Sequence, residues 1–161
     1  MSPRPLAALL VLALSACAAA PRFSDLPERP SPAPRDIAAH IEANLDRRVL
    51  WGAMVIELHE TADGVELELL GFPLDAQLRP VPRARDGGRF IARPLGPIDP
   101  EQAVPGRFLT LSGVVVGAHE GELHGSPNAW PVVEASEIHL WPRDWNTREQ
   151  PRIGIGIGVR L

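Results

Sequence analysis

Residues 49–60 read VLWGAMVIELHE, and residues 65–69 read VELEL after an Asp-Gly pair at positions 63 and 64. The first stretch is apolar on both faces at its start and then alternates, which is typical of a β-strand. The second alternates apolar and acidic residues, so it predicts a half-buried antiparallel strand. An Asp-Gly pair between two such runs is a strong hairpin-turn signal. The sequence therefore predicts a β-hairpin as the first unit of the fold.

Further strand patterns follow the hairpin. They cover residues 89–93, 107–118, 130–141 and 153–161, and Gly113 marks a bulge or a bend in the second of them. The 18 prolines and 14 glycines cut the chain into short segments, which favours strands and turns over long helices. Because no long crossover helix is available, most pairings are expected to be antiparallel. The expected fold class is mainly β. We expect a small antiparallel barrel, closed or partly open, with one or two short helices, and an OB-like barrel is one fold of this kind.

Two helical segments are expected beside the strands. Residues 35–46 place Ile37, Ile41 and Leu45 four apart, which is one stripe of an amphipathic helix. Asp99 precedes a Pro-Glu-Gln sequence and resembles a helix N-cap with proline in the first turn. One helical turn is expected there, and the first helix is expected to pack on the barrel.

The N-terminus has the features of an export signal. A single arginine lies within the first four residues, residues 6–14 are entirely apolar, and Ser15 and Ala16 are small. This order of charged, apolar and small residues predicts a secretory signal peptide over residues 1–16. The apolar run is shorter than the roughly 20 residues that a membrane-spanning helix needs.

The chain's only cysteine follows at once, in the sequence LSAC of residues 14–17. This sequence resembles the bacterial lipobox, which implies cleavage before Cys17 and acylation of its thiol and new amino group. Several acyl chains, at about 0.8 kcal/mol per buried methylene, make a lasting membrane anchor. The alternative is an ordinary signal peptide with a chance cysteine. Ala18 in place of aspartate favours sorting to the outer membrane, by resemblance to lipoproteins of enteric bacteria.

Residues 18–34 are rich in proline and alanine, so they predict a semi-extended tether between the anchor and the folded domain. A single cysteine excludes an internal disulfide and a multi-cysteine zinc site. The formal net charge of −4 argues against nucleic acid as a partner, because phosphates attract basic surfaces. No cofactor is predicted from any motif in the chain.

A family resemblance rests on several motifs that occur in order. They are VLWGAMVIEL, LLGFPLD, RPVPRARDGGRFIA, IDPEQAVPGRFLTLSGVVVG and WPVVEASEIHLWP. Together with the lipobox they resemble the Slp family of outer-membrane lipoproteins, over residues 36–142. Ala53 stands where the family has a second glycine, and Trp130 stands where it has tyrosine. The resemblance implies an outer-membrane lipoprotein linked to stationary phase or envelope stress, without an established catalytic activity.

The expected organisation follows from these features. Residues 1–16 are a lipoprotein signal peptide, residues 17–34 are the lipidated cysteine and its tether, and residues 35–161 are an Slp-like β-barrel domain. The expected location is the bacterial outer membrane, with the barrel facing the periplasm. The membrane is the expected partner, bound through the lipid on Cys17. The sequence does not identify a protein partner or a small ligand.

Polar side chains give weak signals for chemistry. His119 and His124 enclose two glutamates, but their spacing matches no metal motif and a solvated loop explains them. Glu66 and Glu68 share the solvent face of an amphipathic strand, which explains them without catalysis. No serine lies in a nucleophile-elbow sequence. The sequence therefore predicts no catalytic residue, no metal site and no enzyme.

Aromatic residues are the remaining candidates for binding. Trp51, Trp130 and Trp141 are candidate ligand-face aromatics, because barrels of the OB type bind ligands by stacking. Packing anchors in the core are the alternative for the same side chains. The leading hypothesis is a non-enzymatic role in envelope maintenance or stress-related interaction. The second is a periplasmic barrel module that binds a ligand or glycan.

Overall fold

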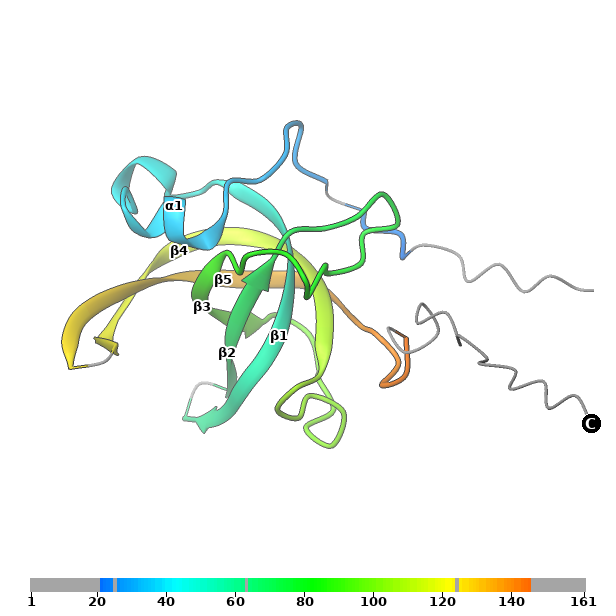
Figure 1. Ribbon diagram of the computed structural model, residues 1–161. Coiled ribbons are helices and arrows are strands. Elements are labelled where there is room, and N and C mark those ends of the chain that lie inside the picture. The colour runs from blue at the N-terminus through cyan, green and yellow to red at the C-terminus, as the bar shows by residue number, and fades with distance from the viewer. Residues whose placement is uncertain (1–20, 25, 63, 124, 146–161) are drawn as a thin grey trace, which may run out of the picture.

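The computed structural model describes residues 21–145, apart from residues 25, 63 and 124 (Figure 1). The elements are α1 (Pro34–Ala38), the 3₁₀ turn η1 (Glu42–Asn44), β1 (Arg48–Thr61), β2 (Gly64–Phe72), β3 (Gly88–Pro94), β4 (Phe108–Leu123) and β5 (Ser126–Leu140). Predicted features outside these residues include the signal peptide, Cys17, His124 and the strand at residues 153–161. Among the described residues no helix is both long and apolar enough to cross a bilayer.

Strand pairing closes the sheet into a five-stranded barrel in the order β1-β2-β3-β5-β4. β4 returns to pair with β1, and every pairing is antiparallel except that of β3 with β5. This is the strand order of an OB-like barrel, so the predicted fold class is confirmed. The parallel pair needs no crossover helix, because β4 carries the chain from one of its strands to the other.

The β1–β2 hairpin forms where the Asp-Gly pair predicts it. Thr61 is paired with Gly64 across the turn, and Gly64 has a positive φ of 133°. One bulge, with Ile56 as the extra residue, interrupts the pairing of β1 with β2, and the register is regular on either side of it. Leu67 and Leu69 are fully buried on the inner face of β2, as the alternation of its sequence predicts.

The core fills the barrel interior with side chains from all five strands. Its fully buried residues include Val49, Val55, Leu67, Leu69, Phe90, Leu109, Leu111, Val115 and Val133. Trp51 packs edge-on against Phe90, with ring centroids 4.7 Å apart. The close packing of this interior fixes the strands relative to one another. The ends of the strands in turn fix the positions of the surface loops that join them.

The helix predicted over residues 35–46 is only partly formed. α1 ends at Ala38, and a separate 3₁₀ turn follows. The side-chain amide of Asn44 donates a 2.7 Å hydrogen bond to the carbonyl of His40, which satisfies this helix-end acceptor locally. Ile37 is fully buried and Ile41 packs against the core, whereas Leu45 is 46% exposed, so the stripe ends before Leu45.

The turn predicted at Asp99 is present as a single turn. The backbone amide of Ala103 donates to the carbonyl of Asp99 at 3.1 Å. The carboxylate of Asp99 accepts a 3.0 Å hydrogen bond from the amide of Glu101, as an N-cap side chain would. Ala103 is buried against the core, and the turn closes one end of the loop between β3 and β4.

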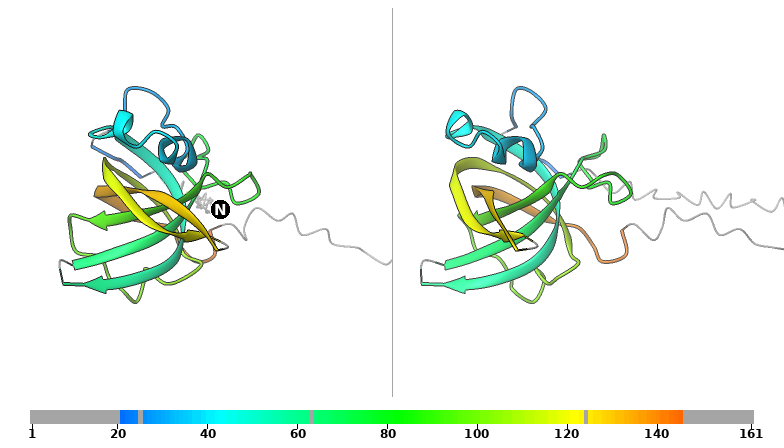
Figure 2. Two further views of the ribbon diagram at one scale, coloured as in Figure 1. Left: turned by 90° about the vertical axis from the view of Figure 1, so that its left-hand side faces the viewer. Right: turned by 60° about the vertical axis from the view of Figure 1, so that its left-hand side comes forward.

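α1 and η1 lie at one end of the barrel (Figure 2). α1 packs against β3 and β5, the strands that form the parallel pair. On another side, β4 and β5 pair as far as Leu123 and Ser126, which makes a long curved hairpin. The pairing of β4 with β5 shifts register twice, with Ser136 of β5 as the extra residue opposite Ser112 and Gly113, and Val116 of β4 as the extra residue before Gly117. The irregularity expected at Gly113 is therefore present, but the bulged residue lies on the partner strand.

Candidate functional site

The N-terminal segment before α1 is fastened to the barrel by short hydrogen bonds. The backbone amide of Leu50 donates to the Ser31 hydroxyl at 2.8 Å, and the Trp51 indole Nε1 donates to the Pro32 carbonyl at 2.8 Å. The backbone amide of Arg35 donates to the Gly87 carbonyl at 2.8 Å. The last residues of the predicted tether therefore run along β1 and the β2–β3 connection.

The β2–β3 connection, residues 73–87, is braced by one acidic side chain. The Asp75 carboxylate accepts hydrogen bonds from the amides of Gln77 at 2.8 Å and Arg79 at 2.9 Å, and from the Arg79 guanidinium at 2.7 Å. Burial raises the pKa of Asp75, but these hydrogen bonds lower it more, so its net pKa lies below the usual 3.8. These bonds fix the turn of residues 75–79, because the side chain of Asp75 accepts from backbone amides within it.

A groove of about 780 Å³ lies between these two segments. One wall is the chain from Leu26 to Asp36, and the other is formed by the end of β2 and the β2–β3 connection (Figure 1). Its apolar lining includes Leu26, Leu50, Phe72, Leu74 and Leu78. The volume falls within the range of about 300–1,000 Å³ that is typical of small-molecule sites. This groove is the best candidate for a binding site among the described residues.

Charged residues stand at the edges of the groove. Arg35 and Asp86 form an ion pair at 3.2 Å, which ties α1 to the β2–β3 connection. Arg29, Arg85 and Glu28 also line the groove and are exposed. The groove therefore combines an apolar interior with charges that reach solvent.

Trp51 lies at the floor of this groove but is only 4% exposed. Its ring packs on Phe90 and its Nε1 binds the Pro32 carbonyl. In this structure it orders the groove wall, and its faces are covered by protein.

Trp141 is buried below the β2–β3 connection. Its Nε1 donates to the Thr110 hydroxyl at 3.0 Å, and this hydroxyl donates to the Leu78 carbonyl at 2.7 Å. His139 packs edge-on against the Trp141 ring at 4.6 Å, and burial lowers the pKa of His139 below its usual 6.5. This chain of contacts supports Leu78 from beneath the groove.

Trp130 lies on the β4–β5 hairpin, away from the groove. It stacks on His119 of the opposite strand, with ring centroids 5.8 Å apart and planes 5° from parallel. Its ring also covers Gly121, where a Cβ would meet the ring at 2.7 Å. The structure therefore does not bring the three candidate tryptophans together, and His119 serves as a stacking partner.

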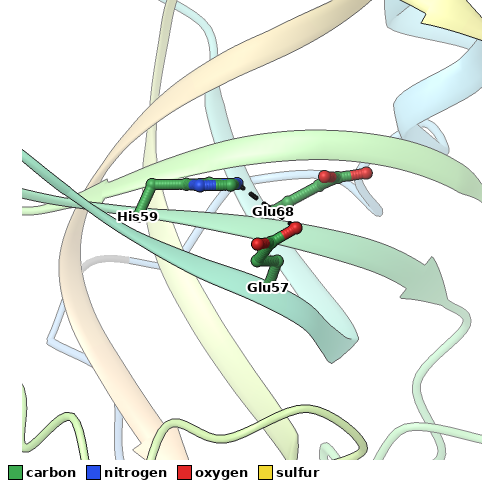
Figure 3. Close-up of side chains that lie close together, drawn as sticks. All are labelled: Glu57, His59 and Glu68. Atoms are coloured by element: carbon green, nitrogen blue, oxygen red, sulfur yellow. Dashed lines mark ion pairs between the residues drawn. The ribbon is translucent and has the colours of Figure 1, made fainter.

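A second group of side chains gathers on the outer face of β1 and β2. Glu57, His59 and Glu68 point toward one another (Figure 3), with ligand-type atoms all within 4.8 Å. Glu68 also accepts a 2.6 Å contact from Arg89, and His59 Nε2 lies 3.9 Å from Glu57. Arg89 of β3 pairs with Glu68 across the strands, whereas His59 lies near Glu57 on the same strand. Glu68 is thus already engaged by a cation of the protein itself.

Sequence reasoning missed this group. Glu57 lies opposite Glu68 because Thr61 pairs with Gly64 at the turn between β1 and β2. Asp63 and Gly64 taken as the two turn residues would instead pair Glu57 with Leu70, so the sequence signal alone gives a different register. Glu66, the other acidic residue considered on β2, instead binds Arg93 at 2.7 Å.

Comparisons with known proteins identify relatives over much of the chain. It is 26% identical to a Haemophilus influenzae protein over 109 residues, 67% of this chain and 56% of that protein. It thus spans little more than half of that relative's length. It is 25% identical to the Escherichia coli lipoprotein YeaY, over 84% of this chain and 70% of that protein.

The outer membrane protein Slp of Escherichia coli is 26% identical over 80% of this chain and 69% of that protein. The family model described as the outer membrane lipoprotein Slp family matches residues 14–156. That match begins within the predicted lipobox and runs through the whole described barrel. The chain therefore belongs to the Slp family of bacterial outer-membrane lipoproteins.

Proposed function

We propose that this protein is a non-enzymatic lipoprotein that holds its barrel at the periplasmic side of the outer membrane. Lipid on Cys17 is the anchor, and the barrel serves envelope maintenance or a stress-related interaction. The proposal draws on the family membership and on the lipobox sequence of residues 14–17. The proposed function consists of binding and of position at the membrane, and it involves no catalysed reaction.

One observation carries this proposal most directly. The chain that follows the anchor does not reach the barrel as a loose end: Pro32 accepts the Trp51 hydrogen bond, and Pro34 is buried. Only residues 18–30 separate Cys17 from this docked part of the chain. A short connection of this kind keeps one end of the barrel beside the membrane surface, where a contact role is exercised.

The test is the intact mass of the protein extracted from isolated envelopes, beside a Cys17→Ser variant. We expect a mass for residues 17–161 plus covalent lipid in the natural chain, and no lipid in the variant. Protease digestion of intact cells and of cells with a permeabilised outer membrane then gives the orientation. A lipid-free natural chain would contradict the anchor, and digestion in intact cells would contradict the periplasmic side.

A second candidate function is binding of a small ligand, and the groove favours it. Its volume of about 780 Å³ suits a small molecule, and its interior is lined by leucine and phenylalanine side chains. Apolar walls fit an apolar ligand better than a glycan, which needs many polar partners. A rise in melting temperature with added ligand, absent in a groove variant, is the expected result.

A further inference from the structure

We propose that the groove holds an acyl chain of an anionic phospholipid, with the lipid phosphate at Arg29 and Arg85. This inference deepens the second candidate function and rests on the outer-membrane location. It names the class of ligand and the residues that would recognise each of its two parts.

The apolar part of the ligand is matched by the groove interior. Leu50 of β1 lines the same space as Leu74 and Leu78 of the β2–β3 connection. Leu26 lies at the lip and is 52% exposed, although it is a large apolar side chain. Exposed apolar surface that continues into an apolar groove is costly in water, and burying a hydrocarbon chain there removes this cost.

The position of the groove selects a membrane lipid as the apolar ligand. Its wall begins at Leu26, and residues 18–25 are all that separate this wall from the proposed anchor on Cys17. Eight residues span at most about 28 Å when fully extended. The lip of the groove is thus kept within about one bilayer thickness of the membrane surface, where phospholipid is the most concentrated source of acyl chains.

The charges at the rim select an anionic headgroup. Arg35 is already paired with Asp86, whereas Arg29 and Arg85 are exposed and form none of the ion pairs between described residues. Guanidinium groups bind phosphate through paired hydrogen bonds, which makes arginine well suited to this contact. Glu28 also lines the groove and is exposed, and its carboxylate would repel a phosphate, so the proposed phosphate contacts are those of the two guanidinium groups alone.

The test is native mass spectrometry of the mature protein extracted from outer membranes in detergent. The probe is phosphatidylglycerol with palmitoyl and oleoyl chains, and the comparison lipid is phosphatidylcholine with the same chains. The denatured mass reports covalent lipid on Cys17, and the difference between native and denatured masses reports lipid held in the groove. Failure of the anchor and failure of this inference are therefore seen separately.

Two variants have matched controls. Leu26→Asp puts a charge at the lip, and Leu95→Asp puts the same charge on a 65% exposed leucine outside the groove. Arg29→Ala with Arg85→Ala removes the rim cations, and Arg83→Ala removes an exposed arginine of the same connection that does not line the groove. Every side chain changed in these variants is exposed, so we expect all of the variants to fold. Only Arg83 and Arg85 lie in the β2–β3 connection.

We expect one phosphatidylglycerol per chain in the natural protein and in both controls. Occupancy should fall at least fivefold in Leu26→Asp and in the double arginine variant, and phosphatidylcholine should bind at least threefold more weakly. Equal occupancy in variants and controls, no retained lipid, or a dimer in place of the lipid adduct would each overturn the proposal. Melting temperatures measured on the same samples show whether any loss comes from unfolding.

Discussion

At the scale of single residues, Trp51 connects the core, the groove and the N-terminal segment. It packs on Phe90 in the core, lines the groove, and binds the Pro32 carbonyl through Nε1. A side chain expected from the sequence to be either a ligand platform or a core anchor is thus buried in this structure. Its polar atom joins the N-terminal segment to the barrel, which neither simple interpretation describes.

Trp51→Phe is expected to lower the free energy of unfolding by about 1–2 kcal/mol. The phenyl ring keeps most of the packing, but the Pro32 carbonyl loses its 2.8 Å hydrogen bond. Urea unfolding at neutral pH measures the difference. Limited proteolysis should also cut the chain before α1 faster in this variant.

Trp130→Phe is the matched control, because Nε1 of Trp130 is buried without a hydrogen-bond partner among the described residues. Removing an unsatisfied donor relieves a cost, so a smaller loss of stability is expected. An equal or larger loss in Trp130→Phe would show that the indole hydrogen bond to Pro32 contributes little.

At the scale of elements, glycines shape the β4 strand in two different ways. Gly113 and Gly117 both lie at register shifts against β5. A Cβ at Gly113 would collide with the Glu134 carbonyl oxygen, whereas a Cβ at Gly117 would meet nothing within 4 Å. The two strands approach closely at the first position only, so the two glycines are not equivalent.

Gly113→Ala is therefore expected to destabilise the barrel by about 2–3 kcal/mol, because backbone must move to admit the methyl group. Gly117→Ala should change the free energy of unfolding by less than about 0.5 kcal/mol. Urea unfolding of the two variants, measured side by side, tests the difference. Similar values for both would contradict the close approach of β4 and β5 at Gly113.

The β2–β3 connection predicts a dependence of stability on pH. The pKa of Asp75 is lower in the folded chain than its usual 3.8, so the unfolded chain binds its proton first as the pH falls. The stabilisation by this carboxylate is complete above the unfolded pKa. It is lost as the pH falls from about 4 through the folded pKa.

Asp75→Asn keeps an oxygen acceptor but loses the charge that binds Arg79. We expect the variant to be less stable by about 1 kcal/mol at pH 7, and this difference to shrink below pH 4. Urea unfolding between pH 7 and pH 3 gives both profiles. A difference that stays constant to pH 3 would show that this carboxylate is not linked to folding.

At the scale of the whole molecule, α1 joins the N-terminal segment to the barrel core. It packs on β3 and β5 and inserts Ile37, which is fully buried. The chain that precedes α1 forms one wall of the groove. The short helix α1 therefore links the N-terminal segment, which forms one wall of the groove, to the barrel core.

Ile37→Ala is expected to destabilise the protein by about 3 kcal/mol, because it leaves a cavity beneath α1. Leu45→Ala, at a residue that is 46% exposed, should cost less than about 0.5 kcal/mol. Thermal and urea unfolding measure both. If the two substitutions had equal effects, the uninterrupted helix stripe expected from the sequence would describe the protein better than this structure does.

Local sequence patterns determined much of this protein without any tertiary structure. Alternation in VELEL and the Asp-Gly pair predicted the β1–β2 hairpin, and the ordered motifs predicted the family. Such features depend on side-chain period, turn chemistry and short motifs, which neighbours along the chain specify. The Glu57–Glu68 pairing was not predictable in this way, because the observed hairpin pairs Thr61 with Gly64, whereas an Asp-Gly turn at residues 63 and 64 would pair Glu57 with Leu70.

Only the tertiary structure decided how the distant segments meet. The parallel pairing of β3 with β5, the docking of Ser31 and Pro32 on β1, and the groove they enclose join residues far apart in the sequence. No local period encodes these contacts, because they arise when the closed barrel brings a proline-rich segment and a long connection to the same end. The helix at residues 35–46 stopped early for the same reason: core space accepts Ile37 and leaves Leu45 in solvent.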